Sequence, residues 1–65
     1  MNNIIKLHLY ESKTNAYINF NNVNLFIKHL DENFTTIRFI DGNSYAIVIE
    51  TPEEIMKLIE ESNNE

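Results

Sequence analysis

The amino-acid sequence predicts a small α+β domain, an antiparallel β-meander of four to five strands with one C-terminal α-helix packed on one face. Three observations predict this class: short segments in which apolar and polar residues alternate, a hairpin-turn signal at Asp41-Gly42, and a helix-start signal at Thr51-Pro52-Glu53-Glu54. Because the chain has 65 residues and a mass of 7.7 kDa, we expect a single domain over residues 1–65.

The first two strands are expected over residues 3–10 and 15–21. In both, apolar side chains occupy every second position and so share one buried face: Ile5, Leu7 and Leu9 in the first strand, and Ala16, Ile18 and Phe20 in the second. The polar residues between the two strands are of turn-forming types. The two strands are therefore predicted to pair as a hairpin.

Residues 23–30 fit either a helix or a strand. Val23, Phe26, Ile27 and Leu30 have the spacing of an amphipathic helix, whereas Val23, Leu25 and Ile27 alternate as on a strand. A helix here would be short, and it would place two acidic residues at its C-terminal end, where the helix dipole disfavours negative charge. We therefore favour a strand over residues 23–30.

A second hairpin is predicted from strands over residues 34–40 and 44–50. A three-residue loop, Asp41-Gly42-Asn43, would pair Ile37 with Ile47, whereas a two-residue loop would mix apolar and polar positions. The three-residue loop collects five apolar side chains on the buried face: Ile37, Phe39, Tyr45, Ile47 and Ile49. In this loop Asn43 is expected to adopt the left-handed backbone conformation, which asparagine tolerates.

The C-terminal helix is predicted over residues 52–62. Thr51 can cap it, Pro52 suits the first helical position, and Glu54 stands three residues after Thr51, as in a capping box. The expected apolar stripe consists of Ile55, Met56, Leu58 and Ile59. This stripe is predicted to lie across the apolar face of the sheet.

The charge distribution excludes several classes of function. Ten acidic and five basic residues give a net charge of −5, all of which lies in residues 50–65, because residues 1–49 hold four of each sign. An acidic chain with one arginine lacks the phosphate contacts that direct binding to nucleic acid or an anionic membrane needs. The longest aliphatic run, residues 46–49, is too short for a membrane span, so a cytoplasmic location is expected.

The sequence also lacks the signatures of catalysis. The absence of cysteine excludes a disulfide scaffold, Cys-ligated zinc and a thiol nucleophile. His8 and His29 lie on different elements without metal-ligand spacing, and the serines lack the flanking glycines of a nucleophile elbow. We therefore predict no enzyme activity, no catalytic or metal-binding residue and no cofactor.

Two surfaces are candidates for binding a partner. The glutamates of the helix could dock on a basic protein, although such a run can also be a solvated surface that only aids solubility. Aromatic and apolar residues that do not fit under the helix could form a second interface, and a thin core favours a homodimer or a stable complex. The predicted partner-binding residues are Glu53, Glu54, Glu60, Glu61, Tyr10, Tyr17 and Arg38.

The predicted function is that of a small non-catalytic protein-interaction module that binds and modulates a partner protein. Asn, Ile and Lys outnumber Ala, Gly and Pro, as in proteins of low-GC bacteria and their phages. By analogy, this suggests an inhibitor from a phage or mobile element that blocks a host nucleic-acid enzyme through its acidic surface. An alternative is a binder of small anionic ligands formed by homo-oligomerisation, in which Arg38 and Lys6 of several copies converge.

From about residue 20 to 61 the chain also resembles the FlbD/SwrD type of small flagellar protein. The matching residues are Asn21, Leu25, Ile27, residues 36–39, Asp41-Gly42, residues 45–48 and residues 50–55. The Asn-Gly hairpin usual near the N-terminus of that family is replaced here by residues 11–15. The resemblance implies a non-enzymatic accessory of motility that acts through protein contacts. The hairpin and helix also look like a fragment of a LytTR-type DNA-binding domain, but the acidity argues against that role.

Overall fold

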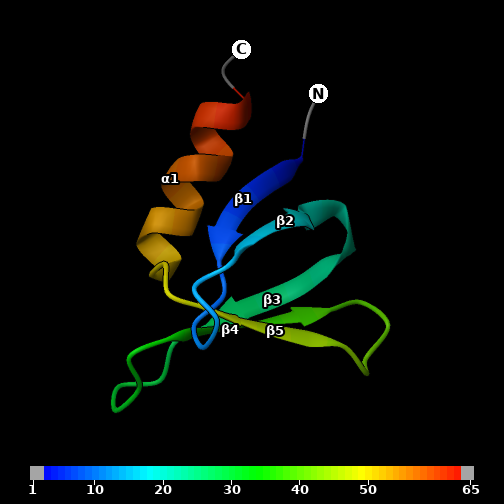
Figure 1. Cartoon of the computed structure of the whole chain (residues 1–65). Helices are drawn as coiled ribbons and strands as arrows, with labels where there is room; N and C mark the ends of the chain where they lie inside the picture. The colour runs from blue at the N-terminus through cyan, green and yellow to red at the C-terminus, as the bar shows by residue number, and fades with distance from the viewer. Residues whose placement is uncertain (1–2, 64–65) are drawn as a thin grey trace.

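In a computed structural model that describes residues 3–63, the chain forms five strands, one 3-10 helix and one α-helix (Figure 1). The elements are β1 (Ile4–His8), β2 (Asn15–Asn19), η1 (Phe20–Asn22), β3 (Val23–Ile27), β4 (Thr35–Phe39), β5 (Tyr45–Val48) and α1 (Pro52–Asn63). The α+β class is confirmed, and the ambiguous segment after residue 22 is a strand. Each strand is shorter than its predicted range.

The strands form two antiparallel sheets, β1-β2 and β3-β4-β5, where a continuous meander was predicted. The 3-10 turn η1 separates β2 from β3, and the side chain of Asn19 caps it by accepting the N–H of Asn21 at 3.0 Å. The sheets meet where the end of β1 reaches β5. There Tyr10 N–H donates to the Ile47 carbonyl at 2.8 Å and Ile49 N–H donates to the His8 carbonyl at 2.9 Å.

The core lies between the two sheets and α1. Its buried apolar side chains are Ile5, Leu7, Ile18, Ile37, Val48 and Ile55. The alternation predicted for the first hairpin is confirmed, since Ile5 pairs with Ile18 and both are buried. In Figure 1, α1 runs along β1 above the three-stranded sheet and closes one side of this core.

The predicted register of the β4–β5 hairpin is wrong by one residue. Ile37 pairs with Ala46 and Thr35 with Val48, so the buried face of β5 carries Ala46 and Val48. The three larger side chains that were expected to be buried lie on the opposite face: Tyr45, Ile47 and Ile49. The predicted burial of Ile37 is confirmed.

The turn between β4 and β5 explains the shift. The Asp41 carboxylate accepts the backbone N–H groups of Asn43 and Ser44, each at 2.9 Å, and the Ser44 hydroxyl at 2.6 Å. These bonds, the Ser44 hydroxyl first, hold the pKa of Asp41 below its ordinary value. Phe39 N–H donates to the Ser44 carbonyl, so the loop comprises residues 40–43. Gly42, with φ of 79°, takes the left-handed conformation predicted for Asn43.

Replacing Gly42 tests this turn. Gly42→Ala should lower the free energy of unfolding by about 1 kcal/mol, because a side chain disfavours the left-handed conformation. A Cβ at this position meets no atom within 4 Å, so the cost arises from the backbone alone. Gly42→Asn should cost less, since asparagine tolerates this conformation. Urea unfolding of the two variants measures the difference, and equal losses would contradict the explanation.

The helix start is confirmed as a capping box. Thr51 N–H donates to Glu54 Oε1 at 2.8 Å, and Glu54 N–H donates to Thr51 Oγ1 at 3.1 Å. Ile55 is fully buried, and Leu58 and Ile59 pack against the core. Met56, predicted to widen the apolar stripe, is exposed instead. Within residues 3–63, no helix is both long and apolar enough to cross a bilayer.

Candidate protein-binding surface

The face of the three-stranded sheet that points away from the core, which we call the outer face, carries apolar side chains on β3 and β5, on either side of the polar residues of β4. The register places its side chains in two rows across the strands, Leu25, Arg38 and Tyr45 in one row and Ile27, Thr36 and Ile47 in the next. By strand alternation, Phe34 and Ile49 extend the same face beyond the ends of β4 and β5.

The outer face is uncovered. Figure 1 shows α1 and the β1–β2 hairpin on one side of the three-stranded sheet, and no helix or strand of residues 3–63 lies on its other side. The exposed fractions of four of its large apolar side chains are 60% for Tyr45, 44% for Leu25, 43% for Ile27 and 40% for Ile49. Single exposed apolar residues are ordinary on a protein surface, but a contiguous group of them is typical of an interface.

Tyr10 forms one border of the outer face. Its ring packs against Phe34, with ring centroids 5.1 Å apart and an interplanar angle of 55°. The Lys13 ammonium lies 4.9 Å from the centre of the Tyr10 ring and donates to the Tyr10 carbonyl at 2.8 Å. Tyr10, predicted as a partner-binding residue, therefore also holds the β1–β2 turn against the sheet.

Arg38 is the one charged residue of the outer face. It stands on the central strand, exposed, with Leu25 and Tyr45 as its cross-strand neighbours. Among residues 3–63, no ion pair or hydrogen bond engages its side chain. An unpaired guanidinium within an apolar surface can form a bidentate contact with a carboxylate.

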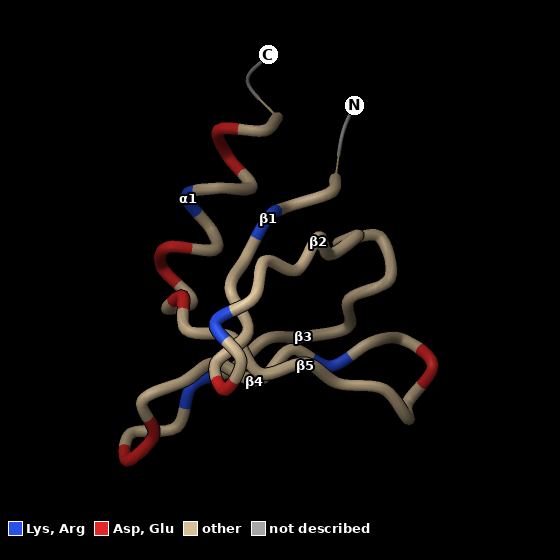
Figure 2. Tube along the Cα trace, in the orientation of Figure 1, with Lys and Arg blue, Asp and Glu red and all other residues tan. Residues whose placement is uncertain are grey.

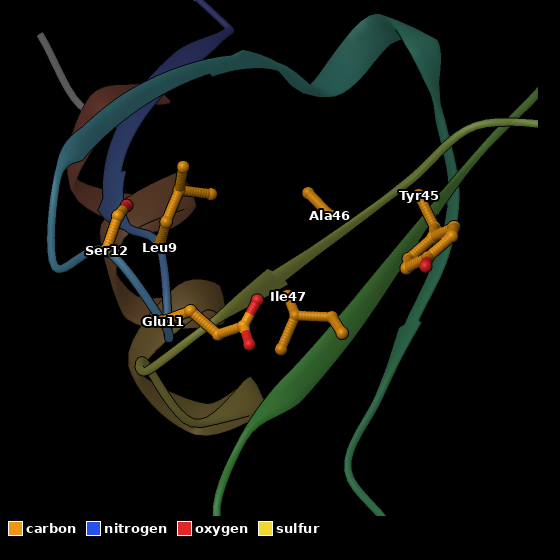
Figure 3. Close-up of a pocket in the computed structure, with 6 residues that line it drawn as sticks. All are labelled: Leu9, Glu11, Ser12, Tyr45, Ala46 and Ile47. Atoms are coloured by element: carbon orange, nitrogen blue, oxygen red, sulfur yellow. The ribbon is translucent and has the colours of Figure 1, made fainter.

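A groove continues the outer face around the edge of β5. Figure 3 shows its lining, with Leu9, Glu11 and Ser12 from the end of β1 and its turn on one side, and Tyr45, Ala46 and Ile47 of β5 on the other. Tyr45 and Ile47 belong to both the groove and the outer face. A partner that covers the outer face can therefore reach into this groove.

The four predicted glutamates all lie on α1, away from the outer face. Figure 2 shows the acidic segments of α1 separated by one basic residue, Lys57. Lys57 is three or four residues from each of the four glutamates, a spacing that places it beside them on the helix surface: Glu53, Glu54, Glu60 and Glu61. The four glutamates of α1 thus surround Lys57. One of them, Glu54, also accepts a hydrogen bond in the capping box.

The remaining predicted site residues are not brought together. Tyr17 is exposed on β2, where it pairs with Lys6 on the face of the β1–β2 hairpin that points away from the core. Arg38 lies on the other sheet. Arg38 and Lys6 of one chain therefore do not converge on a shared anion, and such a site would need several copies.

A polar groove between β1 and α1 contains an interaction that sequence reasoning missed. The Nδ1–H of His8 donates to Glu50 Oε2 at 2.6 Å, and His8 N–H donates to Glu50 Oε1 at 3.0 Å. The hydroxyl of the buried Thr35 donates to the Glu50 carbonyl at 2.6 Å. His8 and Glu50 are 42 residues apart, so no local sequence pattern indicates their contact. A prediction from sequence would have required knowing that the end of β1 lies beside the end of β5.

The environment of Glu50 favours its charged form. Burial by itself raises the pKa of the carboxyl, but the hydrogen bonds from the His8 ring and backbone outweigh burial and lower it overall. The groove is lined by Lys6, His8, Glu50, Glu54, Lys57, Leu58 and Glu61. Its lysines are thus accompanied by three carboxylates. Within residues 3–63, no three histidine, aspartate or glutamate side chains are grouped as metal ligands.

Comparisons with models of protein families, with curated proteins and with solved structures found no match. The class of the protein is therefore described from its structure alone. It is a small α+β protein whose three-stranded sheet has an uncovered face with exposed apolar side chains around one arginine. The resemblance to FlbD/SwrD-type proteins stays a prediction.

Proposed function

We propose that this chain is a small, non-catalytic protein-interaction module that binds and modulates a partner protein through the outer face. The observation that carries the proposal is the exposure of four large apolar side chains on one side of a sheet, on both sides of the central strand: Leu25, Ile27, Tyr45 and Ile49. Contact with another protein would remove this apolar area from water, which is the main favourable term in protein association. The expected cytoplasmic setting belongs to the same proposal.

The acidic surface of α1 supports a second candidate function, inhibition of a basic partner such as a nucleic-acid enzyme by a phage or mobile-element protein. Its support is the charge of −5 in residues 50–65 and the exposure of the four glutamates. Lys57 at the centre of these glutamates reduces the local negative charge, and α1 exposes one large apolar side chain, Met56. A role as a FlbD/SwrD-like accessory of motility would also use protein contacts and is compatible with either surface.

Affinity capture with surface variants separates the two candidates. Tyr45→Asp places a charge on the outer face, and the double variant Glu53→Lys/Glu60→Lys reverses charge on α1, while both leave the core untouched. The full-length chain and both variants are immobilised, incubated with lysate of the source organism, and the captured proteins are quantified by mass spectrometry. Circular dichroism confirms that each variant is folded.

We expect Tyr45→Asp to reduce capture of the partner at least tenfold, because it removes a large aromatic contact and places beside Arg38 a carboxylate that must be dehydrated when the partner binds. The α1 double variant should retain capture within a factor of about three, since exposed rim charges contribute little to affinity. The reverse pattern would assign binding to the acidic surface. Absence of any protein captured specifically by the wild-type chain would count against both candidates.

A further inference from the structure

We propose that the outer face accepts an amphipathic α-helix of another protein whose apolar stripe contains one carboxylate, and that this carboxylate pairs with Arg38. The inference rests on the proposed function and names the chemistry of the partner. Three observations support the inference: the dimensions of the outer face, the single unpaired charge on it, and the lack of a surface on a second copy of the chain that would match both.

The dimensions of the outer face suit one helix. Neighbouring strands lie about 4.8 Å apart, so the backbones of β3 and β5 are separated by about 10 Å, which is close to the diameter of an α-helix with its side chains. Strands of five residues are about 17 Å long and match about three helical turns. A helix lying along β4 would contact both rows of outward side chains.

The charge on this face specifies one feature of that helix. A docked helix would cover Arg38, which stands between Leu25 and Tyr45 and has no partner of its own among residues 3–63. Burying a charge without an opposite charge opposes binding strongly. A carboxylate at the centre of the apolar stripe removes this penalty, and the planar guanidinium can bind both of its oxygens.

A second copy of the chain does not supply this chemistry. The two rows of the outer face hold no carboxylate, and Glu11 lies outside them, in the groove at the edge of β5, so packing two outer faces with their centres aligned would bury two guanidinium groups without a counter-charge between them. The exposed side of α1 holds glutamates, but Met56 is its one large exposed apolar side chain, so α1 of another copy lacks the required stripe. These two mismatches favour a different protein as the occupant.

A displayed peptide library tests the chemistry directly. The library consists of three-turn to four-turn helical peptides with leucine and isoleucine at the stripe positions and one central stripe position randomised to all amino acids. Selections are run in parallel on the immobilised full chain, on Arg38→Glu and on Lys57→Glu. The last variant makes the same charge change on α1, on a different side of the molecule.

We expect wild type and Lys57→Glu to enrich aspartate or glutamate at the randomised position at least tenfold over lysine and arginine. Arg38→Glu should reverse that preference toward lysine or arginine. Nuclear magnetic resonance shifts on binding of a selected peptide should centre on the outer face, at residues such as Leu25 and Tyr45.

Peptides that bind the outer face without a preference for an acid, or with a preference that survives Arg38→Glu, would overturn this inference and leave the proposed function standing. A library that yields no peptide of micromolar affinity would also overturn the inference, while the capture experiment with Tyr45→Asp would still decide the proposed function. Selected peptides whose shifts centre on α1 would contradict both.

Discussion

Ile37→Asp is expected to abolish the folded state, whereas Ile47→Asp is expected to leave the domain folded. Ile37 is fully buried between the sheets and α1, so a carboxylate there would lose its hydration without gaining a partner. Such burial costs several kcal/mol, which approaches or exceeds the roughly 3–5 kcal/mol of stability that a domain of this size possesses. Ile47 lies half-buried on the outer face, so a carboxylate there keeps part of its hydration and should cost roughly 1–2 kcal/mol.

Far-ultraviolet circular dichroism and thermal unfolding of the two variants measure this difference. The pair also discriminates between the two registers of the β4–β5 hairpin, because the three-residue loop predicted from sequence would bury both isoleucines on one face. Unfolding by both substitutions would therefore support that register over the observed pairing of Ile37 with Ala46.

Glu50→Ala should have the second-largest effect, a loss of about 2–3 kcal/mol in the free energy of unfolding. The carboxylate accepts two hydrogen bonds from His8. A hydrogen bond to a charged group typically contributes about 1.5–3 kcal/mol to stability. These bonds tie the end of β1 to the segment that enters α1. Glu60→Ala is the matched control, since Glu60 is exposed on α1 and should change stability by less than about 0.5 kcal/mol.

The pH dependence of this effect has a definite sign. Because the folded state lowers the pKa of Glu50 below its ordinary value of 4.5, the stabilisation is complete above that value and is lost as pH falls through the folded pKa. The difference in stability between wild type and Glu50→Ala should thus shrink as the pH falls below 4.5. Urea unfolding between about pH 5 and 3 measures it, and a difference that does not shrink over this range would refute the role given to Glu50.

Local patterns were sufficient for the first hairpin and the helix. Ile5, Leu7 and Ile18 occupy the buried face that their alternation predicted, because each strand has one apolar and one polar side. The capping box of Thr51 and Glu54 forms because both side chains and both N–H groups lie within one turn of backbone. These features depend on residues close in sequence, so the sequence alone suffices to find them.

The candidate site could be predicted only in part. Arg38 and Tyr10 were named from sequence, and both lie on or beside the outer face. Tyr45, Ile47 and Ile49 were missed because the more apolar side of β5 was expected to be buried. In the structure the turn at Asp41 and the close approach of β1 to β5 select the smaller side chains, Ala46 and Val48, for the core.

By itself, the sequence determined the first hairpin, the strands β4 and β5, the helix α1 and their order, since each follows from period, turn chemistry or capping within a few residues. Only the tertiary structure decided which side of the second hairpin is buried, how η1 divides the strands into two sheets, and that His8 meets Glu50. Those outcomes depend on the space left when distant strands pack together, because that space determines which apolar side chains are buried and which remain exposed on the outer face.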